Sequence, residues 1–160
     1  ETGYIKELDF DEFVKLATPY IDKSKAAGKY DYKKLCRLTQ GRIDTLDDIA
    51  GLVNFLEEYG EFDSGLYFNK KMKTDAASAK EVLPKVREKL ASLGEWNNDS
   101  LFAALTGLAA ELGVKNGVVL WPARVAVSGR ENTPGGATEL AELIGKEETL
   151  RRLDCAISAL

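Results

Sequence analysis

The sequence contains no histidine at all, and this absence excludes more chemistry than any other feature of its composition. Ser-His-Asp and Cys-His catalytic centres, histidine general bases and nearly every histidine-bearing zinc site are impossible without it. Cysteine is scarce as well. Cys36 and Cys155 are too few for a zinc ribbon and do not form the pattern of a secreted disulfide scaffold. We therefore expect a protein of the reducing cytoplasm.

Excess positive charge and long apolar runs are also missing. The chain has 22 lysines and arginines against 26 acidic residues, a net charge of −4. A nucleic-acid role would therefore need a local basic surface, since bulk charge does not provide one. No apolar run approaches the ~20 residues of a membrane-spanning helix. Glu1–Tyr4 has no signal-peptide pattern and no initiator methionine, so we expect the chain to be part of something longer.

Hydrophobic residues make up 44% of the 160 residues. In the first part of the chain they follow helical patterns. Asp9 has the position of an N-cap, and the apolar residues after it follow helical spacing up to Ile21, although Pro19 should kink or break that helix. Asp31 is expected to cap a second helix that runs to about Ile43. Thr45 and Asp48 open a third helix, which Gly60 is placed to end.

The second part continues in the same way after an irregular connection over residues 61–74. Thr74 or Asp75 should start helical material through Leu93, where Pro84 predicts a kink or two abutting helices. Asn98 or Asp99 should cap the next helix, which Gly113 ends. A short helix over 138–144 and a terminal helix carrying Leu150, Leu153, Ile157 and Leu160 complete the pattern.

Residues 118–127 are the one stretch that periodicity does not assign. Their β-branched residues favour a strand, but Pro122 argues against a central strand and no partner strand is expected. A helix with proline in its first turn is the better prediction. The chain is then an all-α protein of roughly eight to ten short helices, in two small helical subdomains over residues 1–73 and 74–160.

Enzyme signatures are missing from the sequence. It has no Gly-rich phosphate loop, and its acidic pairs are adjacent residues such as Asp47-Asp48, which point about 100° apart on a helix and do not converge. A stand-alone enzyme is left with no plausible base or nucleophile, and no metal ligands are indicated. We expect neither a catalytic residue nor a metal site in this chain.

Two arginine-containing segments are more informative. Arg42 follows Gln40-Gly41 at a corner between two helices, where it could read a ligand or neutralise a helix C-terminus. Trp121 and Arg124, at spacing three, share a face if their segment is helical, and together can stack on an exposed base. Arg130 and the turn of Thr133, Pro134, Gly135 and Gly136 follow that helix. The alternative is that Trp121 lies in the core and the arginines are ordinary surface residues.

The second segment closely resembles a known family. Residues 122–129 (Pro-Ala-Arg-Val-Ala-Val-Ser-Gly), the Thr-Pro-Gly turn at 133–135 and the Leu-Ile-Gly-Lys-Glu run that begins at Leu143 are similar to the C-terminal end of bacterial glutamyl-tRNA synthetases. Gln40-Gly41-Arg42 followed by Thr45-Leu46 resembles another segment of that family. The resemblance spans nearly the whole chain and is most specific at the C-terminal end.

This resemblance implies an anticodon-binding region folded as an α-helical cage of two subdomains. The implied partner is glutamate tRNA, with no DNA, no membrane and a monomeric state. ATP and Mg²⁺ would belong to the family's catalytic domain, which would precede residue 1, so no cofactor is expected in this chain. It would bind tRNA without forming an aminoacyl bond.

The resemblance also implies roles for individual residues. Arg42 matches the arginine that meets the third anticodon base, and Arg124 matches an arginine near the first base. The turn over Thr133–Gly136 matches a segment whose backbone approaches that first base, and we add Trp121 and Arg130 to the expected tRNA-binding set. Glutamate anticodons end in cytosine, whose acceptors suit a guanidinium, whereas the guanine of glutamine anticodons presents two donors to it.

Two alternatives remain open on the sequence alone. Lys71-Met72-Lys73-Thr74 resembles the Lys-Met-Ser-Lys-Ser loop of class I aminoacyl-tRNA synthetases, but it lacks the middle serine and a histidine-containing partner motif. We expect it to be a solvated linker end that can touch RNA phosphates. The acidic net charge also leaves open a helical protein-interaction module with no nucleic-acid role.

Overall fold

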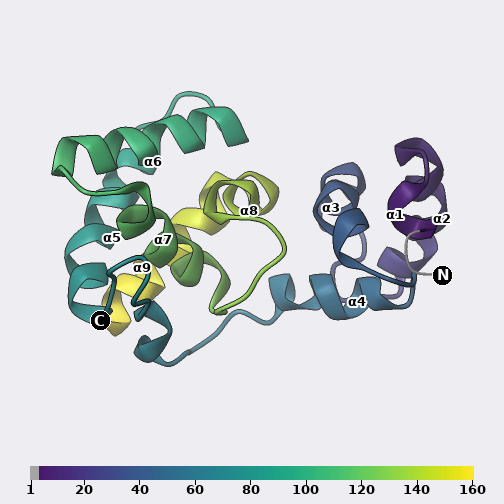
Figure 1. Cartoon of the computed structure of the whole chain (residues 1–160), viewed down its shortest axis with the longest axis horizontal. Helices are drawn as coiled ribbons and strands as arrows, with labels where there is room; N and C mark the ends of the chain where they lie inside the picture. The colour runs from purple at the N-terminus through teal and green to yellow at the C-terminus, as the bar shows by residue number, and fades with distance from the viewer. Residues whose placement is uncertain (1–3) are drawn as a thin grey trace. The chain divides into compact units, whose positions relative to one another are not determined.

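The computed structural model describes residues 4–160, and helices account for almost all of their regular structure (Figure 1). β-pairing within these residues is confined to one isolated bridge between Asn69 and Thr74. The prediction of an all-α protein is confirmed. The chain divides into two compact units: one comprises the residues up to Tyr59 together with Thr133–Gly135, and the other comprises Gly60–Asn132 and Gly136–Leu160.

The first unit is built from short helices, two of which, α2 and α3, start at a capping aspartate. Its elements are α1 (Tyr4–Glu7), α2 (Phe10–Asp22), α3 (Tyr32–Thr39), the 3-10 turn η1 (Gln40–Arg42), α4 (Asp48–Val53) and the 3-10 turn η2 (Asn54–Glu57). The carboxylate of Asp9 accepts from the Glu12 N–H, and that of Asp31 accepts from the N–H groups of Lys33 and Lys34. Both caps were predicted from the sequence. An acidic residue at the N-cap accepts hydrogen bonds from N–H groups that the first turn of a helix leaves unbonded.

Helix ends in the first unit differ from the expectation at three places. The third helix was expected to end at Gly60, but α4 ends at Val53 and the 3-10 turn η2 that follows it ends at Glu57. Pro19 does not break α2, which continues to Asp22 and buries Phe13, Ala17 and Ile21 on one face. Burial of that face outweighs the one backbone hydrogen bond that proline removes. The second helix was expected to reach Ile43, but α3 ends at Thr39 and tightens into η1. A 3-10 last turn is a common way to satisfy the final carbonyls of a helix.

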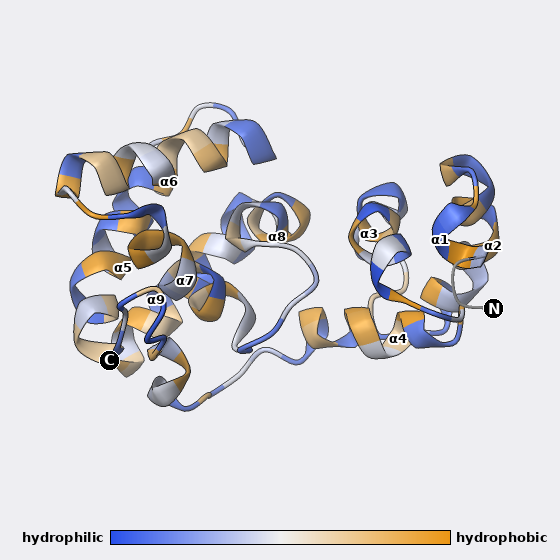
Figure 2. Ribbon diagram, viewed as in Figure 1, coloured by the Kyte–Doolittle hydropathy of each residue, from blue (hydrophilic) through white to orange (hydrophobic). Residues whose placement is uncertain are grey.

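The second unit surrounds one helix with the others. Its elements are the 3-10 turn η3 (Ser64–Tyr67), α5 (Ala76–Ala91), α6 (Asn98–Leu112), α7 (Asn116–Ser128), α8 (Ala137–Ile144) and α9 (Lys146–Ala159). α7 contacts α5, α6, α8, α9 and η3. Val119, Val125 and Ala126 are fully buried in it. Apolar and polar residues alternate along α5 in Figure 2, as expected for a helix with one buried face.

The unassigned stretch over residues 118–127 is helical, as predicted, but its proline is not in the first turn. α7 starts at Asn116, so Pro122 lies in the interior of the helix. Pro84 likewise lies inside a single continuous helix, so the expectation of two abutting helices is wrong. Pro122 is buried in the unit, and this packing compensates for its missing N–H.

Capping at the other helix ends follows the sequence closely. Asp75 and Ser78 form a reciprocal capping box at the start of α5. Asn97, one residue before the expected position, caps α6, which ends as predicted at Gly113 in the left-handed conformation. Across the part of the chain that the structure describes, no helix is long and apolar enough to span a bilayer.

Candidate nucleic-acid interface

Arg42 occupies the end of η1 in the first unit, and its side chain is exposed. Its Nη1 donates to the carbonyl oxygen of Leu38 at 2.7 Å. Leu38 lies in the last turn of α3, so the guanidinium satisfies one of the carbonyls that a helix end leaves unbonded. This contact is the helix-terminus role that the sequence left open. It also fixes the orientation of an exposed guanidinium at the corner between α3 and α4.

Trp121 and Arg124 lie together on one face of α7, as their spacing predicts. The guanidinium carbon of Arg124 is 4.7 Å from the centroid of the Trp121 ring. Trp121 is half-buried, and its indole Nε1 donates to the carbonyl oxygen of Leu66 at 3.2 Å. The indole therefore has its polar edge fixed by η3 and one side covered by a cation, an arrangement stabilised by cation–π attraction.

The other contact of Arg124 holds the segment after α7. Its Nη2 donates to the carbonyl oxygen of Glu131 at 2.6 Å. Burial lowers the pKa of Arg124, while the Glu131 carboxylate acts in the opposite direction. The side chain stays charged at neutral pH, because arginine is not deprotonated in proteins. Arg124 thus ties the loop of residues 129–132 to the helix.

Ser128, a buried residue at the end of α7, also holds this loop through its hydrogen bonds. The Ser128 hydroxyl donates to the carbonyl oxygen of Arg124 at 2.7 Å and accepts from the backbone N–H of Arg130 at 3.1 Å. Gly129 between them adopts φ 68°, a left-handed conformation that ends α7. These contacts fix the backbone of Arg130, which is an exposed residue.

The turn over residues 133–136 is divided between the two units. Thr133, Pro134 and Gly135 group with the first unit, where the Thr133 hydroxyl donates to the Gly135 carbonyl oxygen at 2.9 Å. Gly136 belongs to the second unit and is the N-cap of α8, its N–H bonded to the Glu139 carboxylate at 2.9 Å. From the sequence these four residues were predicted to form one turn, and the pattern of residues gave no sign of this division.

Arg152 is a structural residue that the sequence reading missed. Only 3% of it is exposed, and its Nη1 donates to the carbonyl oxygen of Val127 at 2.9 Å. Its Nε donates to Glu148 at 2.7 Å. Adjacent residues on a helix point about 100° apart, so the pair Arg151-Arg152 could have indicated that one arginine faces the core. Arg152 supports the end of α7, next to the segment that carries Arg124 and Arg130.

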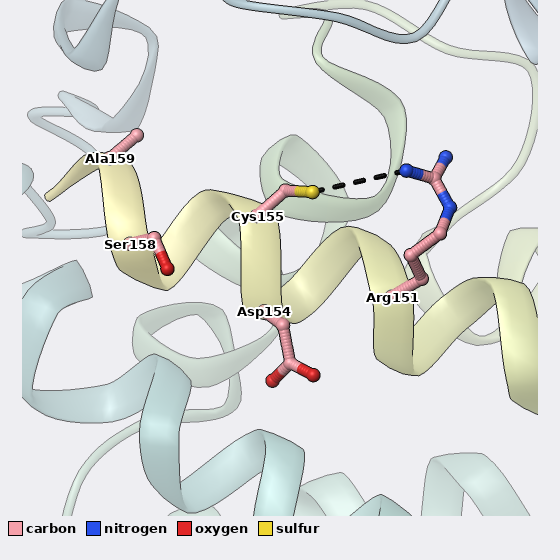
Figure 3. A pocket seen from close by; sticks show the side chains of 5 residues that line it. All are labelled: Arg151, Asp154, Cys155, Ser158 and Ala159. Atoms are coloured by element: carbon pink, nitrogen blue, oxygen red, sulfur yellow. Dashed lines mark hydrogen bonds between the residues drawn. The ribbon is translucent and has the colours of Figure 1, made fainter.

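A shallow pocket lies along the exposed side of α9, lined by Arg151, Asp154, Cys155, Ser158 and Ala159 (Figure 3). Arg151 points toward Cys155, with 3.9 Å between its Nη1 and the sulfur. The charged groups of this pocket already have partners, because Arg151 bonds to Glu148 and Asp154 bonds to Arg87. Within residues 4–160, no group of three or more Cys, Asp or Glu side chains could hold a metal ion.

Comparison with known families matches residues 12–157 to the family described as "Anticodon binding domain". Among curated proteins, the chain is 43% identical over 157 residues to a glutamate–tRNA ligase of Clostridium tetani and 42% identical over 157 residues to that of Lachnoclostridium phytofermentans. Each alignment covers 98% of this chain and 32% of the relative. The chain thus spans about a third of the length of these relatives.

Solved structures share the fold. A glutamate tRNA ligase from Elizabethkingia meningosepticum, crystallised in complex with its amino acid, matches with a TM-score of 0.81 and 22% identity, over 98% of this chain and 30% of that one. The glutamate-tRNA synthetase of Elizabethkingia anophelis matches with a TM-score of 0.71 and 21% identity, over 97% of this chain and 30% of that one. The resemblance indicated by residues 122–153 is confirmed by these comparisons.

Proposed function

Because the chain belongs to the anticodon-binding domain family, we propose that it binds glutamate tRNA at the anticodon, as the tRNA-recognition part of a glutamate–tRNA ligase. The observation that carries this proposal is the family match over residues 12–157, which includes every residue assigned below to the RNA. The curated relatives named above are all glutamate–tRNA ligases, which supports glutamate tRNA as the partner. We further propose that the chain works as a monomer in the cytoplasm.

We assign ATP and Mg²⁺, which glutamylation of tRNA requires, to the part of such a ligase that this chain does not span. The sequence has no histidine, and the described residues offer no acidic or thiol cluster for a metal and no Gly-rich loop for phosphates. We therefore assign to this chain the binding of RNA alone and derive no catalytic step from it.

Arg42 is assigned to the third anticodon base. Its exposed guanidinium is held in place by the Leu38 carbonyl, so a base that approaches the corner between α3 and α4 meets N–H donors that are already oriented. Cytosine offers a ring nitrogen and a carbonyl as acceptors, which match these donors. Guanine presents two of its own donors there, and a donor facing a donor costs about 1–3 kcal/mol.

Arg124 and Trp121 are assigned to the first anticodon base, together with Arg130 and the turn over residues 133–136. The stacked indole and guanidinium form a flat surface of the kind on which an unpaired base stacks. Arg130, an exposed residue of the loop that Arg124 holds, adds a positive charge after the end of α7. Thr133, Pro134, Gly135 and Gly136 are assigned to this base by the family resemblance alone, because Pro134 has no N–H and the Gly136 N–H is already bonded to the Glu139 carboxylate.

The proposal is tested by titrating the chain with labelled glutamate tRNA at low salt, and with the same tRNA carrying guanine in place of cytosine at the third anticodon position. The wild-type chain should prefer cytosine about tenfold or more, which corresponds to the cost of one mismatched donor. Arg42→Gln should reduce this preference to nearly one. Arg37→Gln is the matched control, because Arg37 is an exposed arginine of α3, five residues before Arg42, whose guanidinium carbon lies 5.0 Å from the centroid of the Phe10 ring.

Absence of binding at tens of micromolar tRNA would reject the function, and an unchanged preference in Arg42→Gln would reject that residue's role. The competing protein-interaction module predicts the first of these results. Large exposed hydrophobic side chains within residues 4–160 are Tyr4, Phe68, Phe102 and Val114, which come from four separate segments. Four separate side chains do not by themselves make the apolar patch that such a module needs.

A further inference from the structure

The turn between η3 and α5 presents three lysines on a closed loop. Lys70, Lys71 and Lys73 are exposed, and no acidic residue occurs from Leu66 to Thr74. Asn69 and Thr74 close the loop with two backbone hydrogen bonds of 3.0 and 3.1 Å. The Asn69 side chain accepts from the Met72 N–H at 3.0 Å, and the Thr74 hydroxyl donates to the Tyr67 carbonyl oxygen at 2.7 Å. We call residues 69–74 the lysine turn.

The ammonium groups of this turn are not used within the protein. Among residues 4–160, none of the three makes an ion pair, whereas Lys25, Lys29 and Lys89 are paired with carboxylates at 2.6–2.7 Å. The turn also holds Lys73 at φ 62°, which is the only left-handed residue other than glycine that the structure describes. Such a conformation persists only where surrounding contacts determine it, so the lysines are held on a defined backbone.

α7 is the element that holds the turn. Gly117 lies so close to Met72 that a Cβ atom added there would clash with the methionine sulfur. One turn further along α7, Trp121 donates to the Leu66 carbonyl just before the lysine turn. Gly117, Trp121 and Arg124 follow one another at spacings of four and three residues, so they share a helix face. The lysine turn and Arg124 therefore lie roughly 10 Å apart along that face, at 1.5 Å per residue.

We propose that the lysine turn binds the sugar–phosphate backbone of RNA beside the bases contacted by Arg124, and that Phe68 stacks on an unpaired base there. This inference rests on the proposed tRNA-binding function and adds a site to it. Lysines bind phosphates as point charges without reading sequence, which suits a turn that positions the RNA. Phe68 is 65% exposed immediately before the turn, where an aromatic ring can accept a base.

The charge of the rest of the chain makes this cluster significant. With a net charge of −4, the protein cannot hold RNA by bulk attraction and needs local positive groups. Arg124 and Arg130 supply two such groups near the C-terminal end of α7. The lysine turn supplies three more near the N-terminal end of α7, where Met72 lies against Gly117. A single strand that follows this face would meet positive charge at both ends and Trp121 between them.

The test compares the binding of glutamate tRNA by three forms of the chain over a series of salt concentrations. These are the wild type, K70Q/K71Q/K73Q, and the control K15Q/K80Q/K85Q, which removes the same charge from exposed lysines elsewhere. The lysine-turn variant should lose about tenfold in affinity at low salt, and its salt slope should fall by about 2, at about 0.7 per phosphate contact. The control should keep the wild-type slope. Phe68→Ala should weaken binding about tenfold with an unchanged slope.

Each outcome separates this inference from the proposed function. Failure of the wild type to bind tRNA rejects the function itself. Binding by the wild type together with equal salt slopes in the two triple variants rejects the lysine turn as an RNA contact. Loss of binding to phosphatidylserine vesicles with unchanged tRNA affinity also rejects it in favour of a membrane. Circular dichroism and thermal unfolding verify the fold, and K70Q/K71Q, which leaves Lys73 in place, replaces the triple variant if that variant unfolds.

Discussion

Arg152 and Val127 are joined across 25 positions of the sequence by a buried hydrogen bond of 2.9 Å from guanidinium to carbonyl oxygen. Val127 lies in the last turn of α7, where carbonyls have no partner inside the helix. A buried arginine of α9 supplies that partner, and its charge also suits the negative end of the helix dipole. The end of the helix that carries Trp121 and Arg124 is thus held by a residue that does not itself reach solvent.

Arg152→Met should destabilise the protein by about 2–3 kcal/mol, because it leaves the Val127 carbonyl buried without this donor and removes one partner of Glu148. This loss of unfolding free energy is smaller than that expected for a fully buried ion pair, because the Glu148 side chain is 32% exposed. Urea unfolding monitored by circular dichroism gives the free energy of unfolding for the comparison.

Arg151→Met is the matched control, since Arg151 also bonds to Glu148 but has a side chain that is 55% exposed. Exposed ion pairs contribute little, and we expect a loss below about 0.5 kcal/mol. Equal losses in the two variants would show that the contact with Val127 does not stabilise the protein.

Glu148 should make the stability of the protein depend on acid pH. Hydrogen bonds from Arg151 and then Arg152 lower the pKa of Glu148 from 4.5 to about 2, against the opposing effect of burial. A carboxyl whose pKa is lower in the folded state stabilises that state fully above its unfolded pKa. This contribution should therefore be complete above pH 4.5 and should disappear as the pH falls toward 2.

Urea unfolding of the wild type and of Glu148→Gln at several pH values measures this contribution. The difference in unfolding free energy should be largest near neutral pH and should shrink below pH 4.5. Glu147→Gln, an exposed neighbour in the same first turn of α9, controls for the change in net charge. A difference that stays constant down to pH 2 would rule out Glu148 as its source.

Pro84→Ala should stabilise the protein. Pro84 is exposed inside α5, so its ring contributes little burial, while its missing N–H leaves the Lys80 carbonyl without the usual helical donor. Restoring that donor should raise the unfolding free energy by about 1–2 kcal/mol, after allowance for the greater freedom of the unfolded chain. Pro122→Ala is the contrast, because Pro122 is buried and its loss removes packing. A lower melting temperature for Pro84→Ala would contradict this argument.

These prolines show where the sequence could predict the fold and where it could not. Asp9, Asp31 and Asp75 were recognised as caps or helix starts because capping depends on residues two or three positions away. Pro19, Pro84 and Pro122 were expected to interrupt helices or to begin them, yet all three lie inside continuous helices. Whether a helix survives a proline depends on what its face packs against, and that is set by distant segments.

The same distinction applies to the candidate site. The pairing of Trp121 with Arg124 was predictable, since the period of the helix places residues three apart on one face. Their remaining contacts were not, because the Leu66 carbonyl lies 55 positions from Trp121 and the Glu131 carbonyl lies on an irregular loop. No local pattern marks which carbonyl a side chain will reach.

Gly117→Ala should reveal the contact that holds the lysine turn on α7. In an otherwise wild-type chain, the new methyl group would clash with the Met72 sulfur, so the Met72 side chain has to move. The strain this creates should offset the gain of about 0.5–1 kcal/mol that alanine normally brings over glycine in a helix. In the background of Met72→Ala, the obstacle is gone and Gly117→Ala should show that gain in full. Urea unfolding of the wild type, the two single variants and the double variant measures the coupling between the two residues. Additive effects would mean that Met72 does not rest on Gly117, and the lysine turn would then lack this support from α7.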